Sequence, residues 1–305
     1  MPDTAARTAP KAYLALAAVC FFWGTTYLGI RIALESFPPA VLVSMRFLLS
    51  GGLMVAASIL RGAHLPRGRE LAMASLCGVL ILGIGNGALA YSELLIPSGL
   101  ASLFITISPF WLVGIEALVA GGAPLHGPTI LGMIVGFSGT ALLLTPALGS
   151  HGLRSGAVAG FAITQIGCVS WSLGSILQKR QPDRAHPVVI GAVQQLAAGI
   201  AILPFALLLP SHPIAWTMRG VAAVLYLVTF GSIVGYSAYA YALDKLPVAI
   251  VSIYPYVNAI VAVSLGWLFY REPFGMGEAI AMLVIFTGVA IVKWQGTCIS
   301  PTIHR

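Results

Sequence analysis

The chain contains two sets of five apolar segments, and the second set repeats landmarks of the first. Because five is odd, two copies that both cross a membrane must enter it from opposite faces. Inverted repeats of this kind build many transporter folds, with the solute site at the midplane between the copies. The recurring pairs are Tyr91 with Tyr241, Pro97 with Pro247, Ser102 with Ser252, Gly139 with Gly288, and Trp23 with Trp171.

Composition places the chain in a membrane. Only 8% of its residues are charged and 58% are hydrophobic, and the mean hydropathy is +0.94. Soluble domains carry about 25% charged residues. A water-soluble fold of 305 residues could not cover its surface with so little charge. The sequence therefore predicts an all-α polytopic membrane protein, with the lipid bilayer as its main surroundings.

Ten segments are long enough to cross a bilayer, since a membrane helix needs roughly 20 mostly apolar residues. The connections between them hold Pro and Gly breakers, and none is long enough for a soluble domain. The predicted spans are 12–34, 39–61, 71–95, 98–121, 127–146, 156–178, 187–209, 220–243, 247–270 and 276–294. The predicted organisation is an N-terminal tail (1–11), a first five-helix repeat (12–146), a second, inverted repeat (156–294) and a C-terminal tail (295–305).

Lys and Arg residues predict the orientation, because cytoplasmic loops carry an excess of them. With the N-terminus inside, eleven of these residues lie on the cytoplasmic face and four on the opposite face. Both termini are therefore expected in the cytoplasm. This bias accounts for the net charge of +7. No basic patch interleaved with aromatics is present, so no nucleic-acid partner is expected.

Glycine pairs with GxxxG spacing allow helix backbones to approach closely. Two roles are open for them: packing within the chain, or a face for a homodimer. The pairs are Gly83/Gly87, Gly132/Gly136, Gly156/Gly160 and Gly231/Gly235.

Arg46 is the strongest functional candidate among the polar residues inside the spans, since polar groups in hydrocarbon face a bundle interior or a cavity. It lies about seven residues into its span, or ~10 Å at 1.5 Å per residue. Arg stays charged, so it needs a partner; Glu93 and the carbonyls of broken helices are the candidates. Arg46 either anchors an anionic group or fixes helix ends. Its counterpart in the second repeat is Gln194.

Glu93 and Glu116 are the only acidic residues well inside apolar runs. A carboxyl surrounded by hydrocarbon favours its neutral form, so either is a candidate proton-binding residue. An ion-paired or snorkelling role is the alternative. Their counterparts, Leu243 and Gly266, are uncharged, and the repeat therefore does not support a paired proton relay.

Gly and Pro interruptions near the midplane suggest where a solute would bind, because broken helices expose backbone groups to a cavity. They lie in 83–87 and the aligned 233–237, at Pro109, and around Asn258, where Pro255 precedes the aligned Ala259. Kinks that only improve packing are the alternative. Aromatic residues could wall the cavity and hold flat or cationic solutes. The predicted substrate-binding residues are Trp23, Arg46, Asn86, Trp171, Tyr236 and Asn258.

Enzyme chemistry finds little support. Residues 136–139 read GxSG, but a serine nucleophile at Ser138 needs an adjacent base, and all six histidines lie in connections or the tail. The sequence lacks a GxxxxGK[ST] loop, so no ATP-driven step is expected. HExxH and metal-ligand spacing of Cys and His are also absent, and no cofactor or metal is expected.

A set of short motifs recurs in a fixed order along the ten segments: 23–27, 35–39, 46–47, 85–87 and 97–109, and then 170–174, 256–258, 266–267 and 271–273. In these motifs the sequence resembles EamA-type members of the drug/metabolite transporter superfamily, from about residue 12 to 294. Each motif alone is weak, but their order across ten segments is fairly specific. Two positions depart from the pattern: the family often has proline where Ala259 stands, so Pro255 is the candidate for the kink instead, and Gly122 occupies the place that Glu272 has in the second repeat.

The resemblance implies a permease of a bacterial-type inner membrane that exports small metabolites, such as amino acids, or drugs. It also implies a central cavity between the repeats and alternating access. A fold shared with a family is a weak warrant for a particular function. The alternative from another class is a membrane-embedded binding or assembly protein that moves nothing.

Overall fold

A computed structural model describes residues 3–120, 125–148, 155–181, 185–208, 212–246, 248–251 and 253–298. Within these ranges the chain forms helices and short connections, without strands. The first repeat comprises α1 (Asp3–Leu34), α2 (Pro39–Leu60), α3 (Arg69–Gly78), the π-helix η1 (Val79–Gly85), α4 (Asn86–Ser92), α5 (Ser98–Ile105), α6 (Ser108–Leu118) and α7 (Gly127–Leu148). The second comprises α8 (Ser155–Lys179), α9 (Pro187–Leu208), α10 (Met218–Tyr226), the π-helix η2 (Leu227–Val234), α11 (Gly235–Lys245), α12 (Val248–Val251), α13 (Tyr254–Tyr270) and α14 (Met276–Cys298).

These elements confirm the predicted all-α membrane architecture of two five-segment repeats. Eight described helical runs are long and apolar enough to cross a membrane, and the described apolar part of α14 is shorter. Four of the ten segments are built from consecutive pieces. They are the third (α3, η1, α4), the fourth (α5, α6), the eighth (α10, η2, α11) and the ninth (α12, α13).

The third and eighth segments are interrupted by π-helix. η1 ends at Gly85 and η2 ends at Val234, immediately before Gly235, so both interruptions stop at the aligned glycines. The predicted interruptions at 83–87 and 233–237 therefore begin within the last residues of η1 and η2 and continue past their ends. π-Helical turns occur frequently at functional sites. In these π-helical stretches the helical turns are wider than in an α-helix, while the backbone stays helical.

The fourth and ninth segments break just before a proline. Pro109 is the second residue of α6 and Pro255 is the second residue of α13. Proline is favoured in the first turn of a helix, where its missing N–H is not needed. The alignment of Pro109 with Ala259 is therefore wrong in structural terms, since Pro255 occupies the equivalent place. Ala259 itself is fully buried inside α13.

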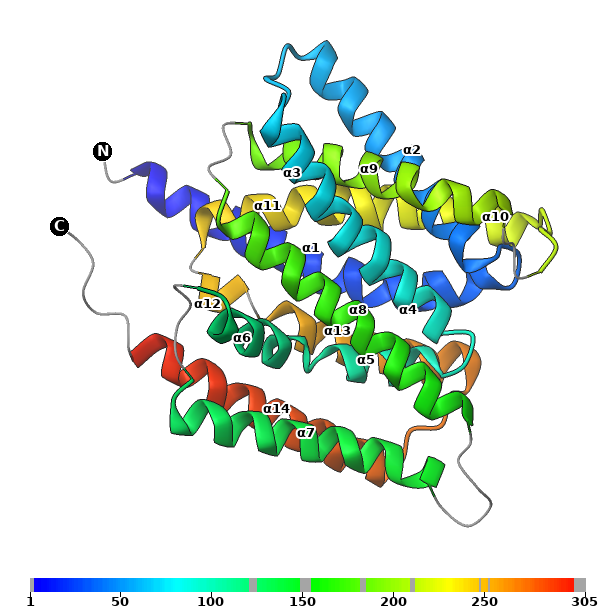
Figure 1. The fold of residues 1–305 in the computed structure, drawn as a ribbon, viewed down its shortest axis with the longest axis vertical. Helices are drawn as coiled ribbons and strands as arrows, with labels where there is room; N and C mark the ends of the chain where they lie inside the picture. The colour runs from blue at the N-terminus through cyan, green and yellow to red at the C-terminus, as the bar shows by residue number, and fades with distance from the viewer. Residues whose placement is uncertain are drawn as a thin grey trace.

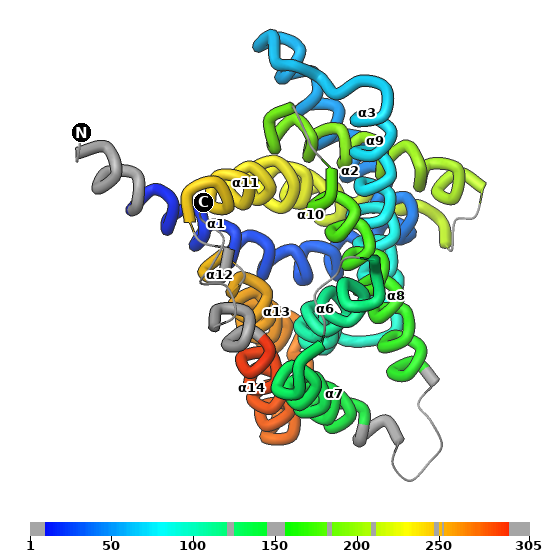
Figure 2. Tube along the Cα trace, turned by 60° about the vertical axis from the view of Figure 1, so that its left-hand side comes forward, coloured from blue at the N-terminus to red at the C-terminus, as the bar shows by residue number. Residues whose placement is uncertain are grey.

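Helices α2 and α9 cross in close contact and join the two repeats. A Cβ added at Gly51 would overlap the main chain of Leu196, and one added at Gly199 would lie 2.6 Å from the Leu48 nitrogen. Gly51 and Gly199 occupy equivalent positions of the two repeats, so each helix contacts its counterpart through the same position, as an inverted repeat requires. Figure 2 shows α2 and α9 side by side, away from the α7–α14 pair.

Helices α7 and α14 form a separate pair along one side of the molecule (Figure 1). A Cβ at Gly132 would lie 2.8 Å from Val292 Cγ2, and one at Gly139 would lie 2.8 Å from Ile285 Cγ1. Gly132 and Gly139 therefore pack α7 against α14 within the chain. Ser138 donates to the Val135 carbonyl at 2.7 Å and is exposed beside this seam.

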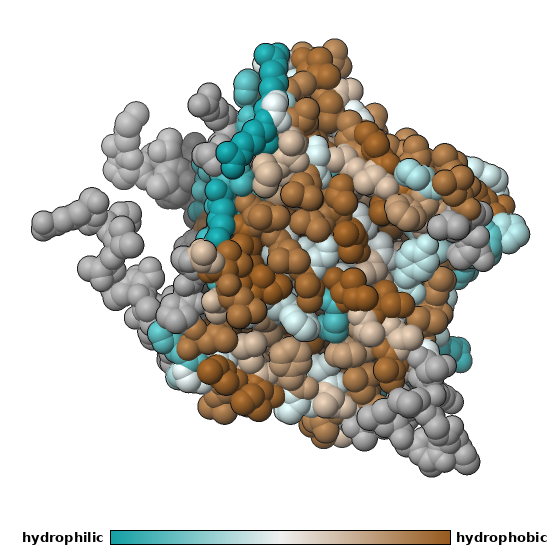
Figure 3. All heavy atoms as spheres, viewed as in Figure 1, coloured by the Kyte–Doolittle hydropathy of each residue, from teal (hydrophilic) through white to brown (hydrophobic). Residues whose placement is uncertain are grey.

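The outer surface is apolar over most of the visible face (Figure 3). Exposed large side chains on helices include Leu60, Leu208 and Trp267, at 87%, 77% and 62% exposure. Hydrophilic residues gather along one edge beside the connection between α2 and α3, where Arg61 and Arg67 are exposed. An apolar band with a charged edge suits lipid around the helices and a headgroup region at their ends.

Adjacent glycines in α2 provide a matched test of the α2–α9 contact. We expect Gly51→Ala to destabilise the fold by about 1–3 kcal/mol, because the added methyl overpacks a backbone contact. Gly52 has no atom within 4 Å of an added Cβ. Gly52→Ala should therefore be neutral or stabilise by up to ~1 kcal/mol through helix propensity. Thermal unfolding in detergent measures both variants, and equal effects would contradict the assigned contact.

Candidate functional site

A cavity of about 130 Å³ lies between the repeats. The first four segments of each repeat line it, while α7 and α14 contribute none of its described lining. All six predicted substrate-binding residues lie on its wall, so the structure brings them together although they come from six elements. They are Trp23 (α1), Arg46 (α2), Asn86 (α4), Trp171 (α8), Tyr236 (α11) and Asn258 (α13).

Arg46 is buried, with 6% of its surface exposed, and its partner lies on η2. Its Nε donates to Ser232 Oγ at 2.9 Å, and the guanidinium carbon lies 5.0 Å from the centre of the Phe47 ring. Glu93, one of the two candidate partners for Arg46, does not pair with it in the described structure, because it follows the end of α4 and lies beside Arg31. No strong sequence signal marked Ser232, a small residue in an apolar run.

The two equivalent tryptophans have different hydrogen bonds. Trp23 Nε1 donates to the Gly231 carbonyl at 2.9 Å and so ties α1 to η2. Trp171 Nε1 makes no hydrogen bond with another described residue. Each indole packs against the aligned glycine of the other repeat, Trp23 on Gly235 and Trp171 on Gly85. Their positions follow the repeat, but only Trp171 retains its donor for a solute.

Aromatic rings extend the wall around Trp23. Its ring centre lies 5.1 Å from those of both Tyr239 and Tyr254, and the two tyrosine rings are 5.6 Å apart. Tyr254 lines the cavity, whereas Tyr239 supports it from behind. The pairs Trp23–Tyr254 and Tyr239–Tyr254 are edge-to-face, an arrangement that stabilises ring pairs beyond their burial.

Tyr236 and Gln194 form part of the scaffold. Tyr236 donates to Gln194 Oε1 at 3.1 Å, and Gln194 Nε2 donates to Gln178 at 3.1 Å. Gln194, the counterpart of Arg46, does not line the described cavity. Its neighbour Gln195 does, and Gln195 accepts a hydrogen bond from Ser50 at 2.6 Å. Sequence reasoning missed Gln195 as a cavity residue. The sequence signal for it is the pair of glutamines in an apolar helix, since polar residues there face a bundle interior.

The two asparagines also differ. When the amide of Asn258 is oriented to suit its neighbours, its nitrogen donates to the carbonyls of Cys20 and Tyr254 at 2.7 and 3.0 Å. Asn86 makes no hydrogen bond with another described residue. Arg46, Asn86 and Trp171 therefore present donors to the cavity, whereas Trp23, Tyr236 and Asn258 hold its wall together.

Glu93 and Glu116 lie outside the described cavity lining. Glu93 is fully buried, and neither carboxylate oxygen has a hydrogen-bond partner in the described structure. Arg31 donates to its main-chain carbonyl instead. Glu116 forms an ion pair with Lys179 at 3.1 Å, and Lys179 is 75% exposed. These two residues, at opposite ends of the bundle, have different surroundings.

Glu272 joins the repeats at the end of the bundle where α5 begins. Its Oε1 accepts from the Ser98 amide at 2.8 Å and from Ser98 Oγ at 2.9 Å, and its Oε2 accepts from the Gly99 amide at 2.8 Å. A carboxylate at a helix N-terminus is favoured by the helix dipole and by the unpaired N–H groups. We call this contact the Glu272 clamp. Gly122, at the corresponding place in the first repeat, lies outside the described residues.

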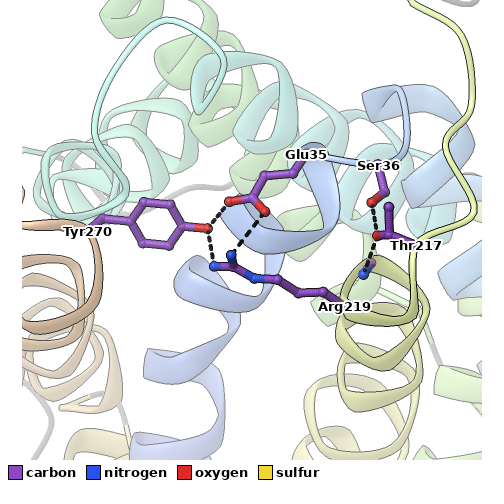
Figure 4. A network of polar contacts seen from close by, with 6 residues as sticks. Glu35, Ser36, Thr217, Arg219 and Tyr270 are labelled. Carbon is purple, nitrogen blue, oxygen red and sulfur yellow. Dashed lines mark hydrogen bonds and ion pairs between the residues drawn. The ribbon is translucent and has the colours of Figure 1, made fainter.

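A second polar network closes the same end (Figure 4). Tyr270 donates to Glu35, Arg219 Nη1 lies 3.5 Å from Glu35 Oε2, and Arg219 Nη2 donates to Tyr270 at 3.1 Å. Ser36 and Thr217 share a hydrogen bond of 2.5 Å beside it. The network links α1 to α10 and α13 across the repeats. Its charged members are exposed, so each ion pair contributes about 0–1 kcal/mol.

No group of three or more His, Cys, Asp or Glu side chains that could hold a metal ion occurs among the described residues. The donors and rings around the cavity can bind a small solute through hydrogen bonds, charge and aromatic contact. Ser138, the serine of the GxSG sequence, lies on α7 outside the cavity lining.

The architecture defines a membrane transporter built from inverted repeats, with a cavity at their interface. The chain belongs to the EamA-like transporter family, whose pattern matches residues 10–145 and 159–294, once in each repeat.

Several relatives carry names of membrane transporters. The chain is 34% identical to "Uncharacterized inner membrane transporter YedA" of Escherichia coli K12, over 91% of this chain and 89% of the relative. It is 26% identical to "Probable terminal-alkyne amino-acid exporter" of Streptantibioticus cattleyicolor, over 78% of each. A protein solved by crystallography shares the fold with a TM-score of 0.67 at 21% identity, covering 95% of this chain and 98% of that one.

The two equivalent tryptophans test which indole donor stabilises the fold. Trp23→Phe should destabilise the protein by about 1 kcal/mol, because the Gly231 carbonyl loses its donor. Trp171→Phe should leave the free energy of unfolding nearly unchanged, because no described hydrogen bond is lost. Thermal unfolding of both variants in detergent measures the difference. A larger loss in Trp171→Phe than in Trp23→Phe would contradict the assignment.

Proposed function

We propose that the protein exports a small metabolite, an amino acid or a related compound, across the bacterial-type inner membrane by alternating access. The single observation that carries this proposal is the cavity lined at matching positions by both repeats. Its volume of about 130 Å³ lies below the ~300–1,000 Å³ of pockets for drug-sized ligands. The size therefore favours a small metabolite over a drug. The printed name of the Streptantibioticus relative supports an amino-acid-like cargo.

Both termini face the cytoplasm in this proposal. The start of α1 and the end of α14 lie on the same side of the molecule (Figure 1), and the Lys- and Arg-rich connections predict that side to be cytoplasmic. The Glu272 clamp and the Glu35 network then lie at the outer end of the cavity. Export requires α5 and α13 to separate there, and the clamp must release when they do.

Transport itself is tested in liposomes. We expect counterflow of at least one labelled amino acid by the purified protein, and a loss of roughly 2- to 10-fold in Asn86→Ala, since hydrogen bonds to a bound solute each contribute about 0.5–1.5 kcal/mol. Ser138→Ala is the matched control, because Ser138 lies outside the cavity and should transport normally. A protein that moves no solute in a broad metabolite panel would favour the alternative, a membrane binding or assembly protein.

We also propose that Glu93 binds the proton that couples transport to a pH gradient. An ionised carboxylate without hydrogen bonds is costly in a buried site, so the neutral acid is the stable form here. The charged and titratable groups that act on it are Arg31 and Tyr27 of α1 and Glu272. Glu116 is ion-paired with Lys179 and partly exposed. Its ionised carboxylate is therefore stabilised without a proton.

The proton proposal predicts a difference between two carboxyl variants. Transport by the wild-type protein should be faster with a pH gradient across the liposome than without one. Glu93→Gln should remove this dependence, because the amide mimics the neutral acid and cannot ionise, and Glu116→Gln should retain it. Transport rates with and without the gradient measure the effect. A gradient dependence that survives Glu93→Gln would exclude Glu93 as the coupling group.

A further inference from the structure

The charge in the cavity comes from one side chain. Among the described residues that line it, Arg46 alone carries a formal charge, and the lining contains no Asp, Glu, Lys or His. The rest of the wall consists of aromatic and aliphatic groups with neutral polar side chains. A solute in this cavity therefore meets one fixed positive charge with no compensating negative charge beside it.

Arg46 has unused donors. Its Nε donates to Ser232, but neither terminal nitrogen donates a hydrogen bond to another described residue, and no described carboxylate lies within ion-pair distance. Arg remains protonated in proteins. A buried charge without a partner is costly, so the guanidinium favours an anionic group on its cavity side.

The terminal nitrogens lie beside the opened backbone of η2. A Cβ added at Gly231 would lie 3.0 Å from Arg46 Nη2. The Gly231 carbonyl accepts from Trp23 Nε1, and the described hydrogen bond of Arg46 goes to Ser232 instead. The planar fork of guanidinium donors matches a carboxylate, which it can bind through two parallel hydrogen bonds.

We infer that Arg46 is the anchor for a carboxylate group of the transported solute, and that the aromatic wall formed by Trp23, Trp171 and Tyr254 receives the uncharged remainder. This inference rests on the proposed function, since it takes the cavity as the substrate site. It deepens that proposal by naming the substrate class: small organic acids and amino acids with a carboxylate. Amines without a carboxylate are excluded, because the cavity offers their ammonium group no anionic partner and a like charge at Arg46.

Matched acids and amides test the anchor directly. The probes are 4-methylpentanoate and 3-phenylpropanoate, their carboxamides, and the amino acids leucine and phenylalanine. Binding to purified protein is measured by tryptophan fluorescence and by thermal stabilisation. We expect at least one carboxylate to bind and its carboxamide to bind roughly 10- to 100-fold more weakly, the loss that corresponds to a charged hydrogen-bond pair.

Variants separate the anchor from the fold. Arg46→Gln, which copies the residue at the aligned position 194, should lose the preference for acid over amide. Arg46→Lys keeps a positive charge but loses the planar fork of donors and should weaken the preference, so it serves if Arg46→Gln fails to fold. Arg180→Gln, at an exposed arginine outside the cavity, is the control and should bind as wild type.

Three outcomes would overturn the inference: carboxamides that bind as well as their acids, acid preference that persists in Arg46→Gln, or no carboxylate in the panel binding at all. Failure here is distinguishable from failure of the proposed function. If the liposomes still move a solute, the protein is a transporter whose substrate lacks the carboxylate anchor. If no solute moves, the transport proposal itself fails.

Discussion

The cavity depends on the close approach of α2 and α9. Because a glycine of each helix meets the main chain of the other, the helices cross with almost no side chain between them. Two hydrogen bonds reinforce the crossing, from Ser44 to the Gly199 carbonyl at 3.0 Å and from Ser50 to Gln195 at 2.6 Å. The crossing places Arg46 and Gln195 on the wall of the same cavity. A looser crossing would move the charge away from the aromatic side chains opposite it.

The repeats share a scaffold and differ at the site. Their common elements are the glycine crossings, the π-helices, the prolines after the breaks and the two indoles that pack on glycine. The differences concern charge and hydrogen bonding: Arg46 faces the cavity while Gln194 binds Tyr236 behind it, and Asn86 has no hydrogen-bond partner among the described residues where Tyr236 is engaged. In the proposed function, the symmetric scaffold exchanges two inverted conformations and the one asymmetric charge selects the solute.

Much of this architecture follows from the sequence. Apolar length predicts the spans, odd-numbered repetition predicts inversion, and costly polar groups in hydrocarbon predict residues that face a cavity. Partners were harder to predict. Arg46 binds Ser232 on a helix remote in sequence, and a small residue in an apolar run has no distinctive pattern. The sequence named Pro255 as the residue that could supply the kink in place of Ala259, but alignment at a constant offset could not place it opposite Pro109, because the break in the second repeat occurs earlier relative to the helix start.

The Glu272 clamp supplies hydrogen bonds that water must replace when the clamp opens. α5 has no cap of its own: the residue before Ser98 is Pro97, whose side chain cannot accept a hydrogen bond, and Glu272 of the other repeat supplies the acceptor. When the repeats separate at this end, two amides and a carboxylate lose their partners together. Lipid cannot replace those hydrogen bonds, but water can. In the proposed export cycle, opening at this end therefore requires water to hydrate the start of α5 before the solute leaves.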